Sequence, residues 1–459
     1  IKRMRRALPF RKPHAVIVSA LTAFVACVTT MRDASADDQS VDAVQTPCDE
    51  LTWLEKVGAA YKQLTDNLEA RAAELSKEQR MMQLASAKLG KGKRAAAYKL
   101  LSFLSASRLA SAQSTLAGAG QKLRSAAQLM QRRKANLQGM LRATKIKTAT
   151  YTGATPAVGT DVYFPTSTAK CTIKAVLADK PATACKSTEG SEAKLNLAAA
   201  HLPKITKVKG VKTADFNFPD IKVAIETKGT PASGHNSDAK KETCADNAEA
   251  KASADNGIGI AAINKVTGML TPAETTLLEG GSNCKAHTDD TDHYIVTLGQ
   301  IATEVCNTRN IIITQPTKLE DETVYNLAQD GTVQTVALLL LGKKLEKTLQ
   351  DAAEKAVAEE LLEGKGAKVK DKVFTELSKK DLKITSGSIT IETSITEAAA
   401  NNDYETEMAY FDGENADEKQ VGKTEASTTK DQPTKKTNPE DKSGDKKDGD
   451  TLKTLCSSF

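Results

Sequence analysis

The chain has 459 residues, of which 40% are hydrophobic and only 4% aromatic, and its formal net charge is +6. Residues 1–36 hold seven of the 64 basic and one of the 58 acidic residues, which leaves 57 of each sign in the rest of the chain. This balance lacks the excess of basic residues that is typical of a nucleic-acid-binding protein. The length allows one large core or two modest ones, and the scarcity of aromatic rings favours closely packed helices over a β-sandwich.

The first 36 residues have the pattern of a secretory signal peptide. Basic residues come first, then an apolar run, then small residues that end in a cleavage site: Arg5, Arg6, Arg11 and Lys12, Ala15 to Val28, and Ala36. The apolar run is short for a membrane span, and the alternative interpretation is a short buried core helix. We expect residues 1–36 to be removed and the mature chain to enter the secretory pathway.

Residues 49–144 are expected to form a long antiparallel helical hairpin. Thr46 and Pro47 supply an N-cap and a first-turn proline. Apolar residues then recur at heptad spacing on two segments separated by the GKGK turn: Leu54, Val57, Tyr61, Leu64, Leu68, Leu75, Met82 and Leu89, then Leu109, Leu116, Leu123, Met130 and Leu137. Gly118 and Gly120 mark a bend or a brief interruption of the second helix. An exposed apolar stripe would be unfavourable on either helix, so the two stripes predict that the helices pack against each other as a coiled coil.

Residues 145–331 predict an irregular α+β lobe held by disulfides. Clusters of Thr, Gly, Pro and Lys interrupt short apolar stretches that predict strands and loops: DVYF, CTIKAVL, IKVAIET and NIIIT. The stretch IGIAAINKVTGML predicts a short helix. A lobe of this kind has no deep core, and cross-links stabilise it by restricting the unfolded chain.

Eight cysteines are present, and six remain when Cys27 of the signal segment and Cys456 near the end are set aside. The six are Cys48, Cys171, Cys185, Cys244, Cys284 and Cys306. An even number in a secreted chain predicts disulfides, and the spacing alone leaves about 15 pairings open. No Asn-x-Ser/Thr sequence occurs, so we expect no N-glycosylation.

Residues 332–411 predict further helices. Between Thr332 and Glu363 one apolar face recurs, and Gly364 and Gly366 end the segment: Leu338, Leu341, Leu345, Leu349, Ala353, Val357 and Leu361. Residues 368–380 and 391–411 are weaker helix candidates. From Gly413 to Phe459 the composition is dominated by Lys, Asp, Glu, Thr, Gly and Pro, which predicts a disordered hinge and a short C-terminal remnant.

The catalytic motifs of P-loop enzymes, zinc proteases, serine hydrolases and dithiol oxidoreductases are missing from the sequence. Gly257-Ile258-Gly259 resembles part of a dinucleotide fingerprint, but the preceding residues do not predict a strand, so we interpret it as a loop leading into a helix. We therefore predict a protein that is not an enzyme and has no cofactor.

One segment, 281–294, concentrates potential metal ligands: Cys284, His287, Asp289, Asp290, Asp292 and His293. The spacing of the first two is typical of zinc sites. An oxidised cysteine, however, cannot act as a thiolate ligand, and the Asp-rich run lacks the glycine and terminal glutamate of a calcium loop. We predict a solvated loop tied down by a disulfide and no metal site.

This organisation resembles the A-type N-terminal domain of trypanosome variant surface glycoproteins. The specific stretches are PCDELTWLEKVGAAYKQL, KGKRAAAYKLLSFLSASRLASA and YETEMAYFDG, and the resemblance covers residues 37–412. It implies a homodimeric surface coat protein with a lipid anchor at the plasma membrane, bound by host antibodies and acting in antigenic variation and immune evasion without catalysis. It also implies pairing of Cys48 with Cys185 and of Cys171 with Cys244, which leaves Cys284 with Cys306.

Family members continue past the hinge into small Cys-rich modules and an apolar anchor signal. In this sequence Cys456 is the only cysteine after the hinge, and no apolar segment follows it. We therefore expect either an incomplete copy of the gene or a secreted product. The alternative function is a trypanosome surface nutrient receptor on the same scaffold, similar to a transferrin receptor. The third interpretation, a zinc hydrolase, requires that Cys284 be a free thiolate.

Overall fold

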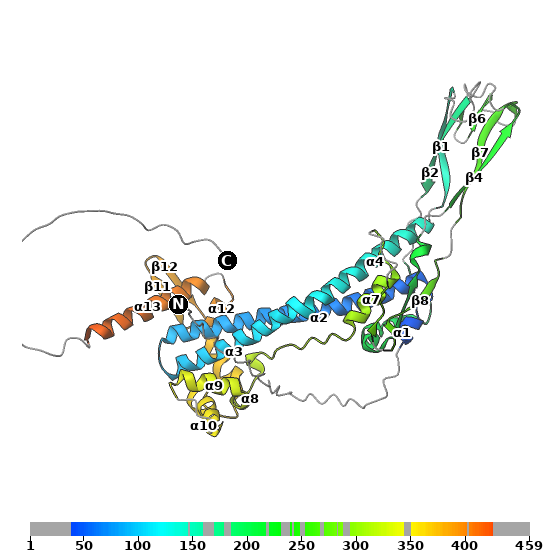
Figure 1. Cartoon of the computed structure of the whole chain (residues 1–459). Helices are drawn as coiled ribbons and strands as arrows, with labels where there is room; N and C mark the ends of the chain where they lie inside the picture. The colour runs from blue at the N-terminus through cyan, green and yellow to red at the C-terminus, as the bar shows by residue number, and fades with distance from the viewer. Residues whose placement is uncertain are drawn as a thin grey trace, which may run out of the picture. The chain divides into compact units, whose positions relative to one another are not determined.

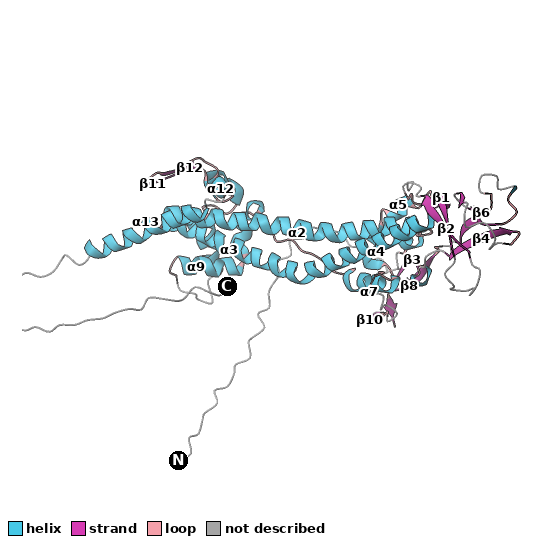
Figure 2. Ribbon diagram, turned by 90° about the horizontal axis from the view of Figure 1, so that it is seen from above, coloured by secondary structure: helices cyan, strands magenta, loops and turns pink. Residues whose placement is uncertain are grey.

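A computed structural model shows a mainly helical protein with small antiparallel sheets (Figures 1 and 2). It describes residues 38–145, 147–158, 169–178, 185–216, 220–230, 239–240, 243–247, 253–266, 270–281, 283–287, 294–343, 350–401 and 404–425. The expected signal peptide, its cleavage site at Ala36 and the DVYF stretch lie outside these residues. The chain divides into two compact units, residues 1–72 with 110–316 and residues 73–109 with 317–459.

The predicted helical hairpin is confirmed. α2 (Pro47–Leu89) turns at Gly90, and α3 (Lys93–Thr115), the π-helical segment η1 (Leu116–Gly120) and α4 (Gln121–Lys145) follow without a gap. The π-helical turn falls at the two glycines expected to interrupt the helix. Along α2 the predicted stripe is buried except at Leu64 and Leu89, and supercoiling of the pair stays a prediction.

Unit 1 has an apolar core between the first half of α2, α4 and shorter helices. Trp53, Leu54 and Val57 of α2 pack with Leu123 and Met130 of α4 in one buried cluster. The shorter elements around it are α1 (Gln39–Asp42), α5 (Glu192–Leu195), α6 (Ala198–His201), η2 (Leu202–Lys204), η3 (Thr213–Asp215) and α7 (Leu298–Thr308). The amphipathic α7 begins with a capping box between Thr297 and Gln300.

The strands of unit 1 form four small antiparallel sheets. β1 (Lys147–Val158) pairs with β2 (Ala169–Ala178), β3 (Lys207–Val211) with β8 (Pro272–Thr276), and β9 (Leu278–Glu279) with β10 (Asn283–Cys284). The fourth sheet has the order β4-β7-β6-β5, with β4 (Asp220–Lys228), β5 (Ala239–Lys240), β6 (Thr243–Ala245) and β7 (Gly257–Val266). The CTIKAVL and IKVAIET stretches are strands, as expected.

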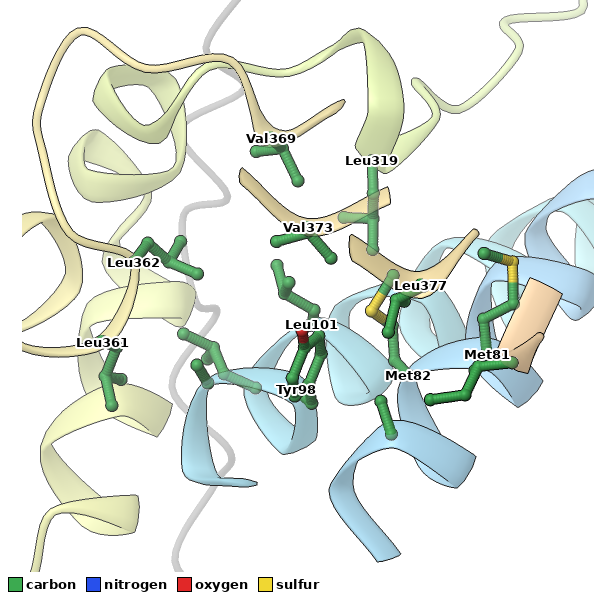
Figure 3. Packing of buried hydrophobic residues seen from close by; sticks show 14 of the residues in the cluster. Met81, Met82, Tyr98, Leu101, Leu319, Leu361, Leu362, Val369, Val373 and Leu377 are labelled. Atoms are coloured by element: carbon green, nitrogen blue, oxygen red, sulfur yellow. The ribbon is translucent and has the colours of Figure 1, made fainter. Parts of the chain in front are cut away.

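Unit 2 is built on the end of the hairpin that contains the Gly90 turn. Met81 and Met82 of α2, Leu101 of α3, and Leu361 and Val373 of later segments share one buried cluster (Figure 3). The later elements are η5 (Leu319–Asp321), α8 (Val324–Gln329), α9 (Gly331–Leu340), α10 (Gln350–Lys355), η6 (Ala356–Leu361), η7 (Lys370–Phe374), α11 (Thr375–Leu377), α12 (Ile395–Ala398) and α13 (Tyr404–Glu425), with the hairpin β11 (Leu382–Ser386)–β12 (Ile389–Thr393).

Three sequence predictions of secondary structure are wrong. Residues 257–266 form β7 instead of a helix, because β4 and β6 offer backbone partners on both sides. The NIIIT stretch leads from a turn into irregular chain and is no strand. The helix expected from Thr332 to Glu363 is interrupted after Leu340, where Gly342 adopts a φ of +67°, a left-handed conformation that ends helices.

Helix α13 continues past the composition change at Gly413 and ends at Glu425. No helix among the described residues is both long enough and apolar enough to cross a membrane.

Candidate functional site

Three disulfides hold the loops of unit 1, and their pairing matches the one implied by the family resemblance. Cys48 is bonded to Cys185, Cys171 to Cys244, and Cys284 to Cys306, with Cα–Cα distances of 5.4, 5.9 and 5.7 Å. The first attaches residues 185–191 to the start of α2, the second attaches β2 to β6, and the third attaches β10 to α7. Each therefore joins an irregular segment or short strand to a separate element.

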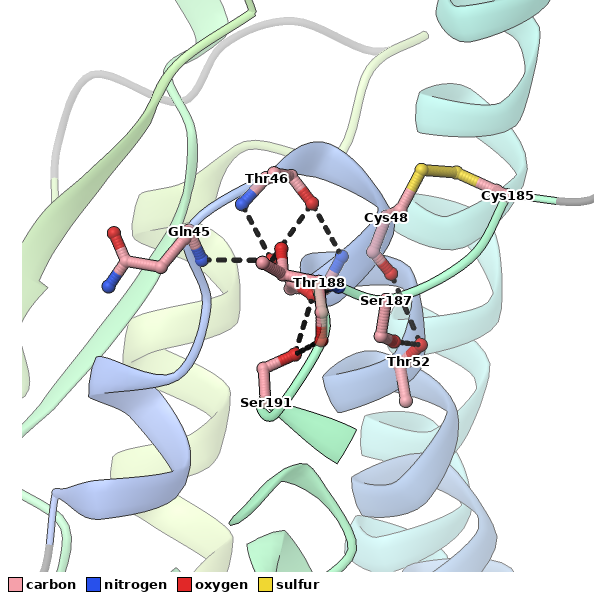
Figure 4. The surroundings of a disulfide bond; sticks show 9 residues. Gln45, Thr46, Cys48, Thr52, Cys185, Ser187, Thr188 and Ser191 are labelled. Carbon is pink, nitrogen blue, oxygen red and sulfur yellow. Dashed lines mark hydrogen bonds between the residues drawn. A yellow bond between two sulfur atoms is a disulfide. The ribbon is translucent and has the colours of Figure 1, made fainter. Parts of the chain in front are cut away.

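The Cys48–Cys185 bond lies beside a buried carboxylate that receives hydrogen bonds from two segments (Figure 4). The Asp49 side chain is fully buried and accepts from the backbone N–H and hydroxyl of Thr46, from the backbone N–H and hydroxyl of Thr188, and from the hydroxyl of Ser191. Burial raises the pKa of Asp49, but the hydrogen bonds from Thr188, Thr46 and Ser191 outweigh it and leave the pKa lowered. The carboxylate thus fastens the 185–191 loop to the N-terminus of α2 as an anion.

A buried ion pair between Arg133 and Glu50 holds the backbone at Val296 and at Val211. Arg133 of α4 is fully buried, and its Nε donates to Glu50 Oε1 at 2.9 Å and its Nη1 to the Val296 carbonyl at 2.8 Å. The other Glu50 oxygen accepts the backbone N–H of Val211 at 2.7 Å. The Arg133 guanidinium also lies 4.6 Å from the centre of the Phe216 ring. Burial raises the pKa of Glu50, and Arg133 opposes this shift.

Gly210 is required beside this ion pair. A Cβ atom at position 210 would lie 2.6 Å from Oε1 of Glu50, which is closer than any normal contact. Strand β3 can therefore approach the ion pair only where it carries no side chain.

The structure describes only some of the potential metal ligands of segment 281–294. Cys284 is oxidised, and His287 Nε2 lies 3.1 Å from the Thr276 carbonyl. Asp289, Asp290, Asp292 and His293 lie outside the described residues. No group of three His, Cys, Asp or Glu side chains within the described ranges is placed to hold a metal ion.

In unit 2 the carboxyl of Glu78 on α2 titrates near neutral pH. Burial raises its pKa to about 7, and the backbone N–H groups of Leu319 and Glu320, at 3.0 and 3.4 Å, oppose the shift. A carboxyl of this kind is a candidate general acid or base. Here both of its oxygens accept backbone hydrogen bonds, so its contacts tie residues 319–320 to α2.

An open groove in unit 2 encloses about 760 Å³ between α2, α3 and α13. Its lining mixes Lys99 and Phe103 of α3 with Tyr404 and Asp412 of α13. Phe103 is 48% exposed, and the Lys99 ammonium lies 6.0 Å from its ring centre. Its described lining contains no His and no Cys.

The six cysteines were predictable from the sequence, whereas the roles of Asp49, Glu50 and Arg133 were not predicted. A signal for the ion pair was present, because Glu50 lies four residues before Leu54, and Arg133 lies between Met130 and Leu137, so both fall on the apolar faces of their helices. A charge at such a position predicts a buried partner. The hydrogen bonds of Asp49 to Thr188 and Ser191 had no comparable signal, because about 140 residues separate them.

The fold matches solved structures of one family. The variant surface glycoprotein VSGsur bound to suramin superposes with a TM-score of 0.65 and 20% sequence identity, over 83% of this chain and 100% of that one. Another structure of the variant surface glycoprotein VSGsur gives a TM-score of 0.60, again with 20% identity, over 82% of this chain and 100% of that one. No family model matches the sequence, and no curated protein matches it. The chain thus has the fold of these glycoproteins.

Proposed function

We propose that this chain is a variant surface glycoprotein and contributes to the dense coat on the surface of a trypanosome. The single observation that carries the proposal is the likeness of fold, which extends over the whole length of the matched coat protein. The predicted mature chain begins near Ala36, and its first body cysteine is bonded to Cys185 beside the N-terminus of the long helix. These features support a secreted, disulfide-bonded surface protein.

The proposed mechanism separates a buried scaffold from exposed loops within the same chain. The hairpin helices are specified by buried residues such as Leu54, Leu68 and Leu75, where a polar substitution would be costly. In contrast, all nine residues of β4 are exposed. Surface segments with little core tolerate substitution, so their sequence can diverge between copies while the fold is kept.

In this proposal the chain is a homodimer, and its exposed loops are the surface that host antibodies bind. Divergence at these loops then allows evasion of the host immune response. A lipid anchor is the expected attachment to the outer face of the plasma membrane. The buried charges Asp49, Glu50 and Arg133 serve the fold and take no part in catalysis, because each is saturated by partners inside unit 1.

The proposal is tested by following clonal lines under antibody pressure. A line that expresses this chain is exposed to antibodies raised against the folded protein, and the surface protein of the surviving cells is identified. We expect survivors to express divergent chains in its place. If the survivors keep this same chain, and if unrelated lines also carry it unchanged, the coat function is wrong and a surface nutrient receptor becomes the better explanation.

A further inference from the structure

Unit 2 also has a cavity that is separate from the open groove beside α13. It encloses about 580 Å³ between α3, the end of η6 and the η7–α11 segment. None of its lining residues lines the groove. Ligand-binding cavities in proteins enclose roughly 300–1,000 Å³, so this cavity has room for a small organic molecule.

The floor of this cavity is apolar. Its side chains all belong to the buried cluster of unit 2, and each is at most 6% exposed: Ala97, Tyr98, Leu101, Leu361, Leu362 and Val373. Figure 3 shows the two leucines at the end of η6 on one side and Tyr98 and Leu101 of α3 on the other. An apolar group that enters the cavity is therefore removed from water on more than one side.

The rim of the cavity carries three carboxylates, and two of them have no paired cation. Glu376 forms an ion pair with Lys379 at 2.7 Å. Glu363 and Asp371 are exposed, and neither forms an ion pair with any residue that the structure describes. Their charges are therefore available to a ligand.

Two cations, Arg94 and Lys372, also lie on the rim. The Arg94 side chain is hydrogen-bonded to the Tyr98 hydroxyl. Three carboxylates against two cations give the rim a net charge of −1. A negative rim above an apolar floor is complementary to a molecule that has a positive group at one end of an apolar body.

Glu363 has a backbone conformation that glycine usually occupies. Its φ is +51°, and the other described residues with positive φ are all glycines. This left-handed conformation is unfavourable for a residue with a Cβ atom, and helices commonly end with a glycine in it. The turn alone would favour glycine, so the charge of Glu363 at the edge of the cavity is the better explanation for a glutamate here.

We propose that this cavity binds an amphipathic organic cation, with its apolar chain on the floor between α3 and η6 and its ammonium group at the rim beside Glu363 and Asp371. The apolar floor determines the chain, and the two unpaired carboxylates determine the charge of the head group. This site goes beyond the proposed coat function, which does not require it.

Three probes with the same alkyl chain and different head groups test the class of ligand. Octylammonium, octan-1-ol and octanoate are each titrated into the full chain by isothermal titration calorimetry. We expect octylammonium to bind about fivefold more tightly than octan-1-ol, and octanoate to bind more weakly than both, because the rim repels an anion. Tighter binding of octanoate, or no binding of octylammonium, would overturn the proposal.

The length of the chain distinguishes binding in the cavity from ion pairing at the surface. Each methylene group that leaves water should strengthen binding about fourfold along the series butylammonium, hexylammonium and octylammonium. An affinity that is the same for all three would show that the ammonium group alone is bound, and it would contradict the role of the floor.

Substitutions at the rim should have effects of opposite sign on octylammonium binding. Glu363→Gln and Asp371→Asn each remove a carboxylate and should weaken binding about threefold, whereas Lys372→Met removes a like charge and should strengthen it about twofold. Glu359→Gln is the matched control, because Glu359 is on η6, pairs with Lys355 and does not line the cavity. Equal weakening by the substitutions at 359 and 363 would contradict a site at the rim.

A larger side chain on the floor tests the location of the site. Ala97→Leu adds apolar volume inside the cavity and should weaken octylammonium binding at least about tenfold. Ala110→Leu makes the same change at an exposed position of α3 and should have no effect. Circular dichroism establishes that both variants are folded, and unchanged binding by a folded Ala97→Leu variant would overturn the proposal.

Glu363→Gly separates a role in binding from a role in folding. Glycine relieves the unfavourable backbone conformation, so this variant should unfold at a higher urea concentration than the wild type. It should nevertheless bind octylammonium as weakly as Glu363→Gln does. A glycine variant that is less stable than the wild type, or that binds as tightly, would contradict the role proposed for Glu363.

Discussion

Individual buried charges decide how the loops of unit 1 are held. Arg133 and Glu50 lie among apolar side chains, yet both charged groups have partners. The carboxylate accepts from the guanidinium and from a backbone N–H, and the guanidinium also donates to the carbonyls of Val296 and Val211 and lies against an aromatic face. Replacing one member leaves the other as an uncompensated buried charge, which costs far more than the pair contributes when intact.

Arg133→Met therefore should lower the free energy of unfolding by about 3–5 kcal/mol, since Glu50 and the Val296 carbonyl lose their donor. Urea titration followed by circular dichroism measures the change. Lys134→Met is the matched control, because Lys134 makes a surface ion pair with Glu55 and should change stability by less than about 1 kcal/mol. Equal effects of the two substitutions would show that the buried pair is not structural.

The contribution of Asp49 to folding stability is expected to depend on pH. Its pKa is lowered in the folded protein, so its contribution to stability is present above the ordinary value of 3.8 and is lost as the pH falls through the lower folded value. Asp49→Asn should cost about 3 kcal/mol at pH 7, because the amide presents N–H groups to the donors of Thr46 and Thr188. The difference from wild type should shrink below about pH 4. Asp66→Asn, at the exposed ion pair with Lys62, is the control.

For Glu78 the dependence of folding stability on pH has the opposite sign. Its pKa is raised from 4.5 to about 7, so the folded protein binds a proton more readily than the unfolded chain between these values. Stability should fall as the pH rises from about 4.5 to about 7, by on the order of 2–3 kcal/mol. Glu78→Gln should remove this slope while Glu74→Gln, at a half-exposed neighbour, should keep it. Chemical unfolding at a series of pH values measures both, and a slope that survives Glu78→Gln contradicts the assignment.

At the scale of elements, the hairpin helices could be predicted from the sequence and several later elements could not. Heptad spacing predicted the buried face of α2 because each helix buries its stripe against the other, and this pattern is local. For β7 the residues IGIAAI fit a helix or a strand equally well, and the choice depends on β4 and β6, which are separate segments of the chain. Likewise, the left-handed Gly342 overrode an apolar periodicity that continued past it.

The disulfides allow a prediction about relative stability. The Cys48–Cys185 bond spans 137 residues and the Cys284–Cys306 bond spans 22. In the chain-entropy account the longer loop contributes about 1.6 kcal/mol more, so Cys48→Ser with Cys185→Ser should destabilise the protein more than Cys284→Ser with Cys306→Ser. Thermal unfolding of the two double variants tests the order, and a reversed order contradicts it.

A thiol count tests whether Cys284 is oxidised at all. When the purified protein is unfolded without a reductant and labelled with a thiol reagent, we expect no free thiol among the six body cysteines. A free Cys284 would restore the metal interpretation of segment 281–294, because a thiolate could then join His287 as a ligand.

The molecule as a whole combines a helical scaffold, loops fastened by disulfides and buried charges, and exposed strands with little core. The fold is shared with the variant surface glycoprotein VSGsur at 20% identity, so the scaffold persists while most side chains differ. In the proposed function antibodies would select on the exposed segments and leave the buried residues unselected, which fits this separation.

The most direct test of the coat function is the abundance of this chain on intact cells. Surface proteins of a clonal line that transcribes the gene are labelled with a membrane-impermeant reagent and quantified by mass spectrometry. The account predicts that this chain is the dominant labelled species, exceeding every other surface protein by at least about tenfold. If it is a minor species beside a different dominant coat protein, the central claim is contradicted.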